Sequence, residues 1–102
     1  MRNAMIIDAK DNVAVAIEPI AKGDAAVYVC EGKEVSLPAL EDITIYHKLA
    51  TRDIAKGEPV VKYGEHIGAA TAFIPAGAHV HVHNVESVKE DRRSKEYRRS
   101  RR

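Results

Sequence analysis

The sequence IAKGEPVVKY at residues 54–63 places a glycine directly before a run of residues that alternate in character, as a half-buried strand does. The same pattern occurs at residues 20–29 (IAKGDAAVYV) and 74–83 (IPAGAHVHVH). In each copy the isoleucine suits a core, and the glycine can adopt the positive φ of a tight turn. The pattern predicts one turn type, used three times and followed each time by a strand.

The spacing of the three copies and the composition define the fold class. The turn glycines are separated by unequal intervals, which argues against a solenoid of fixed period. The chain has 102 residues, of which 45% are hydrophobic and 5% aromatic, and this fits one small domain rich in strands. We predict an all-β fold with short strands at residues 4–7, 13–18, 26–30, 33–37, 44–49, 60–63, 66–73 and 78–84.

The C-terminal segment KEDRRSKEYRRSRR (89–102) differs sharply from the rest of the chain. It carries 8 basic and 3 acidic side chains, whereas residues 1–88 carry 8 basic and 12 acidic ones. Because it has no aliphatic residue to anchor it in a core, we divide the chain into a domain at 1–86 and a tail at 87–102. Ser87 and Glu90 have the spacing of a helix cap, so the tail is expected to be partly helical or disordered.

Several classes of protein are excluded by simple counts. A single cysteine, Cys30, cannot form an internal disulfide framework, and no stretch approaches the length of a membrane span. The sequence also lacks a phosphate-binding glycine loop, a cysteine pair for zinc and a nucleophile elbow. The basic tail could contact nucleic acid, and without a stacking platform of aromatic side chains it would do so without sequence preference. The alternative, a solubilising or subunit-contacting extension, is preferred, so nucleic acid is not expected as the partner. We expect a cytoplasmic protein.

Three histidines alternate with valines in the run 78–84. On a strand this places His79, His81 and His83 on one face, and it turns Val80 and Val82 inward. Neighbouring imidazoles on one face are about 6.6 Å apart along the strand, close enough for two of them to bind one metal ion. The alternative is a polar face that meets solvent or a partner.

A second candidate is the pair His47 and Lys48, in the run TIYHKLA at residues 44–50. A histidine with a pKa near neutrality can move a proton, and a lysine can hold a carboxylate. The alternative is that both are ordinary surface residues. His66 falls in an expected turn and is interpreted as a surface residue.

Four blocks of the sequence resemble the small subunit or N-terminal domain of the altronate and galactarate dehydratases. The blocks are DNVAVA (11–16), HKLATRDIAKGEPVVKYG (47–64), IGAAT (67–71) and HVHVHN (79–84), and they occur in the order of the family. The small subunit of a sulfolactate sulfo-lyase is similar as well. One departure is Tyr46, which stands where the family usually has glycine.

The resemblance implies a SAF-type β-clip fold and a partner, because a much larger subunit or domain supplies most of the active site in this family. It implies a lyase that removes water from a sugar acid and yields a 2-keto-3-deoxy acid. It further implies Fe²⁺ or Mn²⁺, which imidazole ligands suit and which the large subunit can also hold.

Within that reading each candidate residue receives an expected role. Metal binding is assigned to His79 and His81, and proton transfer to His47 and His81. Substrate binding is assigned to Lys48, His83 and Asn84. Three alternatives stay open: a sulfolactate sulfo-lyase subunit, a non-catalytic module that binds a sugar acid or nucleic acid, and assembly of the chain as a homo-oligomer.

Overall fold

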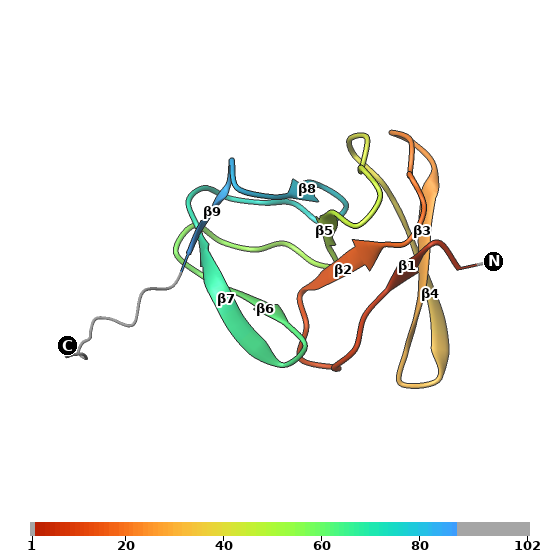
Figure 1. Cartoon of the computed structure of the whole chain (residues 1–102), viewed down its shortest axis with the longest axis horizontal. Helices are drawn as coiled ribbons and strands as arrows, with labels where there is room; N and C mark the ends of the chain where they lie inside the picture. The colour runs from red at the N-terminus through yellow and green to blue at the C-terminus, as the bar shows by residue number, and fades with distance from the viewer. Residues whose placement is uncertain (1, 88–102) are drawn as a thin grey trace.

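The computed structural model describes residues 2–87, which form nine short strands and no helix (Figure 1). The strands are β1 (Ala4–Met5), β2 (Val13–Ala16), β3 (Ala25–Cys30), β4 (Lys33–Pro38), β5 (Lys48–Ala50), β6 (Pro59–Lys62), β7 (Glu65–Ala70), β8 (His79–Val80) and β9 (Val85–Ser87). Strands β1, β2, β5 and β8 form a four-stranded sheet in that order, β3 pairs with β4, and β7 lies between β6 and β9. All pairings are antiparallel. The prediction of an all-β fold is confirmed.

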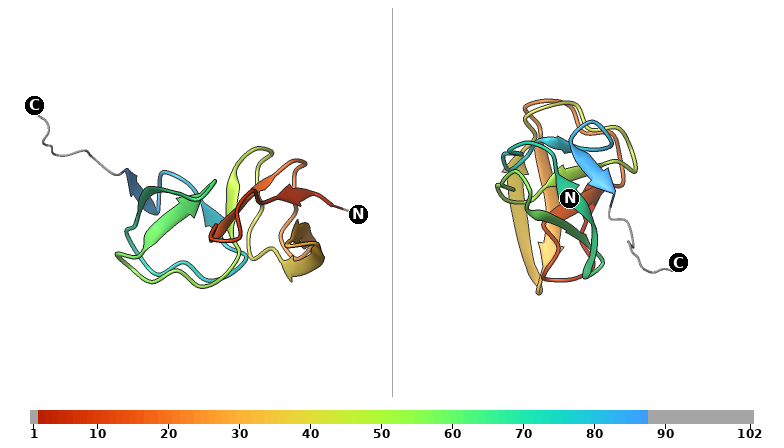
Figure 2. Two further views of the ribbon diagram at one scale, coloured as in Figure 1. Left: turned by 90° about the horizontal axis from the view of Figure 1, so that it is seen from below. Right: turned by 90° about the vertical axis from the view of Figure 1, so that its left-hand side faces the viewer.

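The β3–β4 and β6–β7 hairpins lie at opposite ends of the molecule, with the four-stranded sheet between them (Figures 1 and 2). Side chains alternate across this central sheet, so that Leu49 and Ala14 pack toward the first hairpin. Ala50 and Val13 pack toward the second. The domain therefore has two small cores that share one sheet.

The Ile-x-x-Gly turn predicted from the sequence is present, and the structure adds a fourth copy. The four turns span residues 20–23, 43–46, 54–57 and 74–77. Each begins at a buried isoleucine whose backbone pairs with that of another copy, Ile20 with Ile43 and Ile54 with Ile74. The last residue of each turn donates a backbone hydrogen bond to a buried alanine. The accepting carbonyls belong to Ala39, Ala16, Ala70 and Ala50, in the same order.

The fourth copy escaped the sequence pattern because Tyr46 occupies its glycine position. Tyr46 nevertheless adopts the left-handed conformation, with φ +69°, close to the +91° of Gly23. An L-residue in this region is strained by about 1–2 kcal/mol relative to a right-handed conformation. The turn geometry is thus imposed by the isoleucine pairing rather than by the residue at its end.

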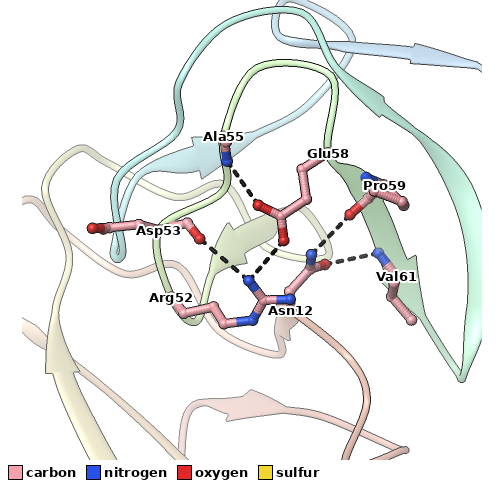
Figure 3. A network of polar contacts seen from close by, with 7 residues as sticks. All are labelled: Asn12, Arg52, Asp53, Ala55, Glu58, Pro59 and Val61. Carbon is pink, nitrogen blue, oxygen red and sulfur yellow. Dashed lines mark hydrogen bonds and ion pairs between the residues drawn. The ribbon is translucent and has the colours of Figure 1, made fainter.

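Two buried or partly buried asparagines show that the two halves are built alike. Asn12 accepts a hydrogen bond from the Val61 N–H at 2.7 Å and donates one to the Pro59 carbonyl at 2.9 Å (Figure 3). Asn3 does the same for the first hairpin, accepting from Val27 N–H at 2.7 Å and donating to the carbonyl two residues earlier. Each side chain therefore holds the start of one hairpin against the central sheet.

Five of the predicted strands are shorter than expected, namely those at 4–7, 13–18, 44–49, 66–73 and 78–84, and the third and the last of these affect the candidate site residues. The strand predicted at 44–49 begins only at Lys48, because residues 43–46 form the fourth turn. The strand predicted at 78–84 ends at Val80, because the N–H of Asn84 returns to the carbonyl of His81 and closes a turn. The short strand β9 was not expected from the sequence.

Most of the predicted tail at 87–102 lies outside the described residues, and so does the proposed helix after Ser87. Ser87 itself ends β9, where it pairs with Gly68 of β7. The domain boundary predicted after residue 86 stays a prediction. Between residues 2 and 87 the chain forms no helix with the length and apolarity of a membrane span.

Substitution of Gly77 by alanine is expected to destabilise the domain much more than the same change at Gly23. Both glycines have φ +91°, but a Cβ on Gly77 would overlap the carbonyl oxygen of Pro38, whereas a Cβ on Gly23 meets open space. We expect Gly23→Ala to cost about 1 kcal/mol and Gly77→Ala at least about 2 kcal/mol more. Urea unfolding of the two variants measures the difference, and equal losses would contradict the packing seen at Gly77.

The buried carboxylate of Asp11 joins the β1–β2 loop to the β6–β7 turn. It accepts backbone hydrogen bonds from Ile7, Asp8 and Gly64, at 3.2, 3.1 and 2.8 Å. Burial raises the pKa of Asp11, but these donors together with the N–H of Tyr63 outweigh it, so the pKa lies below its ordinary value. The folded domain therefore favours the ionised carboxylate.

Substitution Asp11→Asn is expected to cost about 2 kcal/mol at pH 7, since the amide can accept fewer of these hydrogen bonds. Because the pKa is lower in the folded state, the carboxylate stabilises the fold above about pH 4 and loses this effect as the pH falls through the folded pKa. Thermal unfolding between pH 7 and pH 3 should thus show the two proteins converging at low pH. Asp24→Asn, at an exposed carboxylate, is the control.

Candidate functional site

Three imidazoles from two distant segments meet at the β5–β8 edge of the central sheet. His47 lies between the 43–46 turn and β5, and His79 begins β8, where it pairs with Leu49 of β5. His81 follows β8 directly. One ring nitrogen from each of the three histidines lies within 4.8 Å of the others. The antiparallel pairing of β5 with β8 is what brings the two predicted candidate motifs together.

The three rings are nearly parallel and differ in how they meet. Nδ1 of His47 lies 2.9 Å from Nε2 of His79, and the ring centroids are 5.1 Å apart. These two nitrogens therefore face each other in a hydrogen bond, in which one imidazole donates and the other accepts. His81 instead stacks on His47, with centroids 4.1 Å apart and planes inclined by 13°.

The surroundings of His79 and His81 favour the neutral forms of these two imidazoles. Burial lowers the pKa of His79, and the neighbouring imidazoles, His47 first, lower it further, while the Glu41 carboxylate opposes them. The pKa of His81 is lowered by desolvation, by His47 and by Lys48. A neutral imidazole carries a free lone pair, which is what both metal binding and proton abstraction require.

Lys48 lies beside this cluster and lines a hollow of about 160 Å³. The hollow is lined by Lys48, Ile67, His81, Val82, Val85 and Ser87. Burial and the nearby ammonium group of Lys62 lower the pKa of Lys48. A partly desolvated cation that shares a hollow with an imidazole suits the binding of a small anion.

The side chain of Asn84 holds the backbone that carries the imidazoles. It accepts a hydrogen bond from the N–H of His81 at 2.9 Å and donates one to the carbonyl of His79 at 2.8 Å. Glu41 also contributes, since its carboxylate accepts from the N–H of His79 at 3.1 Å. Sequence reasoning missed Glu41, which no spacing connects with the histidines. These contacts favour a positioning role for Asn84 over the predicted contact with substrate.

The expectation of three histidines on one face of a strand was wrong in its geometry. Because the strand ends at Val80, residues 81–84 form a turn, and Val82 is 81% exposed instead of facing inward. Val80 is buried as predicted. His83 is exposed, with its ring 5.2 Å from that of His79. The turn nevertheless keeps His81 in the cluster, because its ring folds back over His47.

Two further polar residues, His66 and Arg52, lie outside the imidazole cluster. His66 is exposed on β7, in agreement with its interpretation as a surface residue, although it belongs to a strand and not to a turn. The guanidinium of Arg52 donates to the Glu58 carboxylate at 2.8 Å and is thereby committed to the 54–57 turn (Figure 3).

The residues of the cluster fit a metal ion. Three imidazoles form a donor set suited to borderline divalent metals. With metal–nitrogen bonds of about 2.1 Å, two ligand nitrogens on one ion lie about 3 Å apart, which is near the 2.9 Å between His47 and His79. Binding would replace the hydrogen bond between these two rings and would require them to turn toward a shared point. His47 thereby joins His79 and His81 as a possible ligand.

Comparison with known proteins identifies the family of the chain. The family described as the altronate/galactarate dehydratase SAF domain matches residues 2–88. The chain belongs to this family. The SAF domain is 46% identical over 81 residues to the altronate dehydratase of Escherichia coli (strain K12), a match that covers 79% of the chain and 16% of that enzyme. It is 36% identical over 87 residues to the altronate dehydratase of Bacillus subtilis (strain 168), covering 85% of the chain and 17% of the enzyme.

A third relative is a much shorter protein. The (2R)-sulfolactate sulfo-lyase subunit alpha of Chromohalobacter salexigens is 36% identical over 86 residues, which are 81% of the chain and 92% of that subunit. The chain therefore spans about a sixth of the length of the altronate dehydratases and nearly all of a sulfo-lyase subunit. The SAF domain thus belongs with lyases and their subunits.

Titration of the chain with Mn²⁺ is expected to show one ion bound per domain. His79→Ala should weaken binding more than about tenfold, because it removes one of three convergent donors. His66→Ala, at an exposed histidine of β7, should leave binding unchanged and serves as the matched control. Isothermal titration calorimetry gives both affinities, and equal affinities for the two variants would contradict a metal site at this cluster.

Proposed function

We propose that this SAF domain is one component of a sugar-acid dehydratase of the altronate/galactarate type. The reaction removes the proton from the carbon that bears the carboxylate and expels the hydroxyl group from the next carbon. The resulting enol tautomerises to a 2-keto-3-deoxy acid. The observation that carries the proposal is the meeting of His47, His79 and His81 beside the Lys48 hollow.

The residues of the cluster divide the chemistry between them. Proton transfer is assigned to the imidazole of His47, and His81, whose ring stacks on it, is the second candidate for this role. Lys48 is placed to bind the substrate carboxylate in the hollow it shares with His81. His83 extends the same edge as a further substrate contact, and Asn84 holds the backbone between them.

His79 and His81 are proposed as ligands of Fe²⁺ or Mn²⁺, with His47 as a third donor. Such an ion supplies stabilisation for the negative charge that develops on the carboxylate when the adjacent proton leaves. The large dehydratase polypeptide can provide further ligands.

A second polypeptide is part of the proposal. The altronate dehydratases contain this domain as 16–17% of their length, so most of their residues lie outside the part that this chain matches. We propose that a separate large subunit supplies the remaining site residues, and that the complex acts in the cytoplasm.

A sulfolactate sulfo-lyase subunit is the second candidate function. It is favoured by the match to 92% of the subunit alpha of that enzyme. Both reactions can begin by removal of a proton next to a carboxylate, and they differ in the group that leaves. Release of sulfite from sulfolactate would identify the second candidate, and a 2-keto-3-deoxy acid formed from altronate or galactarate would identify the first.

Activity is expected when the chain is produced together with a large-subunit homologue from the same genome and supplied with Fe²⁺ or Mn²⁺. Replacing His81 by alanine should lower kcat at least about a hundredfold, because the proposal gives this imidazole a part in proton transfer and metal binding. His66→Ala should retain activity. Full turnover by His81→Ala would remove the cluster from the mechanism. Binding of a sugar acid without turnover in the complex would favour a non-catalytic module.

A further inference from the structure

Tyr46 is held in a conformation that its side chain does not favour, directly before a residue of the candidate site. Its φ of +69° lies in the left-handed region, where the three equivalent turns have glycine. The side chain is 71% exposed, so it gains little from packing within the described part of the chain. Strained residues of this kind concentrate at functional sites. Contacts among residues 2–87 therefore do not explain the tyrosine.

Val82 is a second apolar side chain exposed at the same place. It lies in the 81–84 turn, is 81% exposed, and forms one wall of the hollow that contains Lys48. Tyr46 directly precedes His47, and Val82 directly follows His81, while the rings of these two histidines are stacked 4.1 Å apart. The two exposed residues are thus the chain neighbours of two imidazoles of the cluster, and they come from two different segments.

We infer that Tyr46 and Val82 form the docking rim on which the large dehydratase polypeptide closes over the imidazole cluster. The inference rests on the proposed function, and it identifies the surface used by the partner proposed there. An aromatic and an aliphatic side chain beside a polar site are typical of interface residues that exclude water. Exclusion of water also strengthens the electrostatic contacts of the imidazoles and of Lys48.

The large polypeptide fits this surface better than a second copy of the chain does. In the altronate dehydratases the matched segment accounts for only 16–17% of the chain, so the rest of the enzyme is available to cover the cluster. The cluster itself is assembled from a single chain, so a second copy is not needed to bring its imidazoles together.

The test measures the affinity of the purified large-subunit homologue from the same genome for variants of this chain. Tyr46→Gly and Val82→Ser are each expected to weaken binding about tenfold, while Mn²⁺ affinity remains close to that of the wild type and neither variant unfolds at a lower temperature than the wild type. Ile7→Ser is the matched control. Ile7 is 60% exposed and follows β1, at the opposite edge of the central sheet from β8. This variant should bind within twofold of the wild type.

Four other outcomes would contradict the docking rim or the two-component enzyme. Unchanged affinity for both rim variants would show that the partner docks elsewhere. Unchanged affinity with a raised KM would make Tyr46 or Val82 a substrate contact instead. Association of two copies of the chain that the rim variants abolish would identify a homodimer surface. Failure of the wild-type chain to bind the large subunit would overturn the proposed two-component enzyme itself.

Discussion

Two pairs of buried isoleucines are the interaction on which the rest of this domain depends. Ile20 and Ile43 exchange both backbone hydrogen bonds, at 3.0 and 2.8 Å, and Ile54 and Ile74 do the same at 2.7 and 2.8 Å. Each pair locks two turns together, and each turn leads into a strand. Because short strands have few hydrogen bonds of their own, the paired turns decide where β5 and β8 begin. The position of the imidazoles follows from that.

The site arises where the two similar halves of the domain carry different side chains. His47 and Ala78 are equivalent, since their carbonyls accept the same kind of hydrogen bond from Ala16 and Ala50. The first half therefore contributes a histidine directly after its turn, whereas the second half contributes His79 one residue later. Because the backbone is repeated and the side chains are not, His47 from one half and His79 from the other can meet in one cluster.

The imidazoles of the cluster are only partly buried, and their electrostatics agree with a site that is completed from outside. Burial and the neighbouring imidazoles lower the pKa values of His79 and His81, and burial and the nearby Lys62 lower that of Lys48. Such groups act most strongly when water is excluded. A partly buried cluster of this kind suits one part of a larger enzyme, as the length of the altronate dehydratases also indicates.

Much of this architecture could be predicted from the sequence. The turn glycines and the alternating runs determined an all-β domain, and residue chemistry singled out His47, Lys48, His79 and His81. Local patterns could do this because turn geometry and strand alternation depend on near neighbours. Local patterns could not reveal the fourth turn, because its last residue is Tyr46 and not glycine. The long-range backbone pairing of Ile43 with Ile20 holds Tyr46 in the left-handed conformation.

Only the tertiary structure decided how the candidate residues combine. The contact of His47 with His79 spans 32 residues and exists because β5 pairs with β8. The hydrogen bond from the His79 N–H to the Glu41 carboxylate likewise joins residues that are far apart in the sequence. The length of β8 was also decided by folding, since the hydrogen bonds of the Asn84 side chain end the strand and turn Val82 outward. Composition and spacing therefore determined which groups were available, and the pairing of distant backbone segments determined which of them meet.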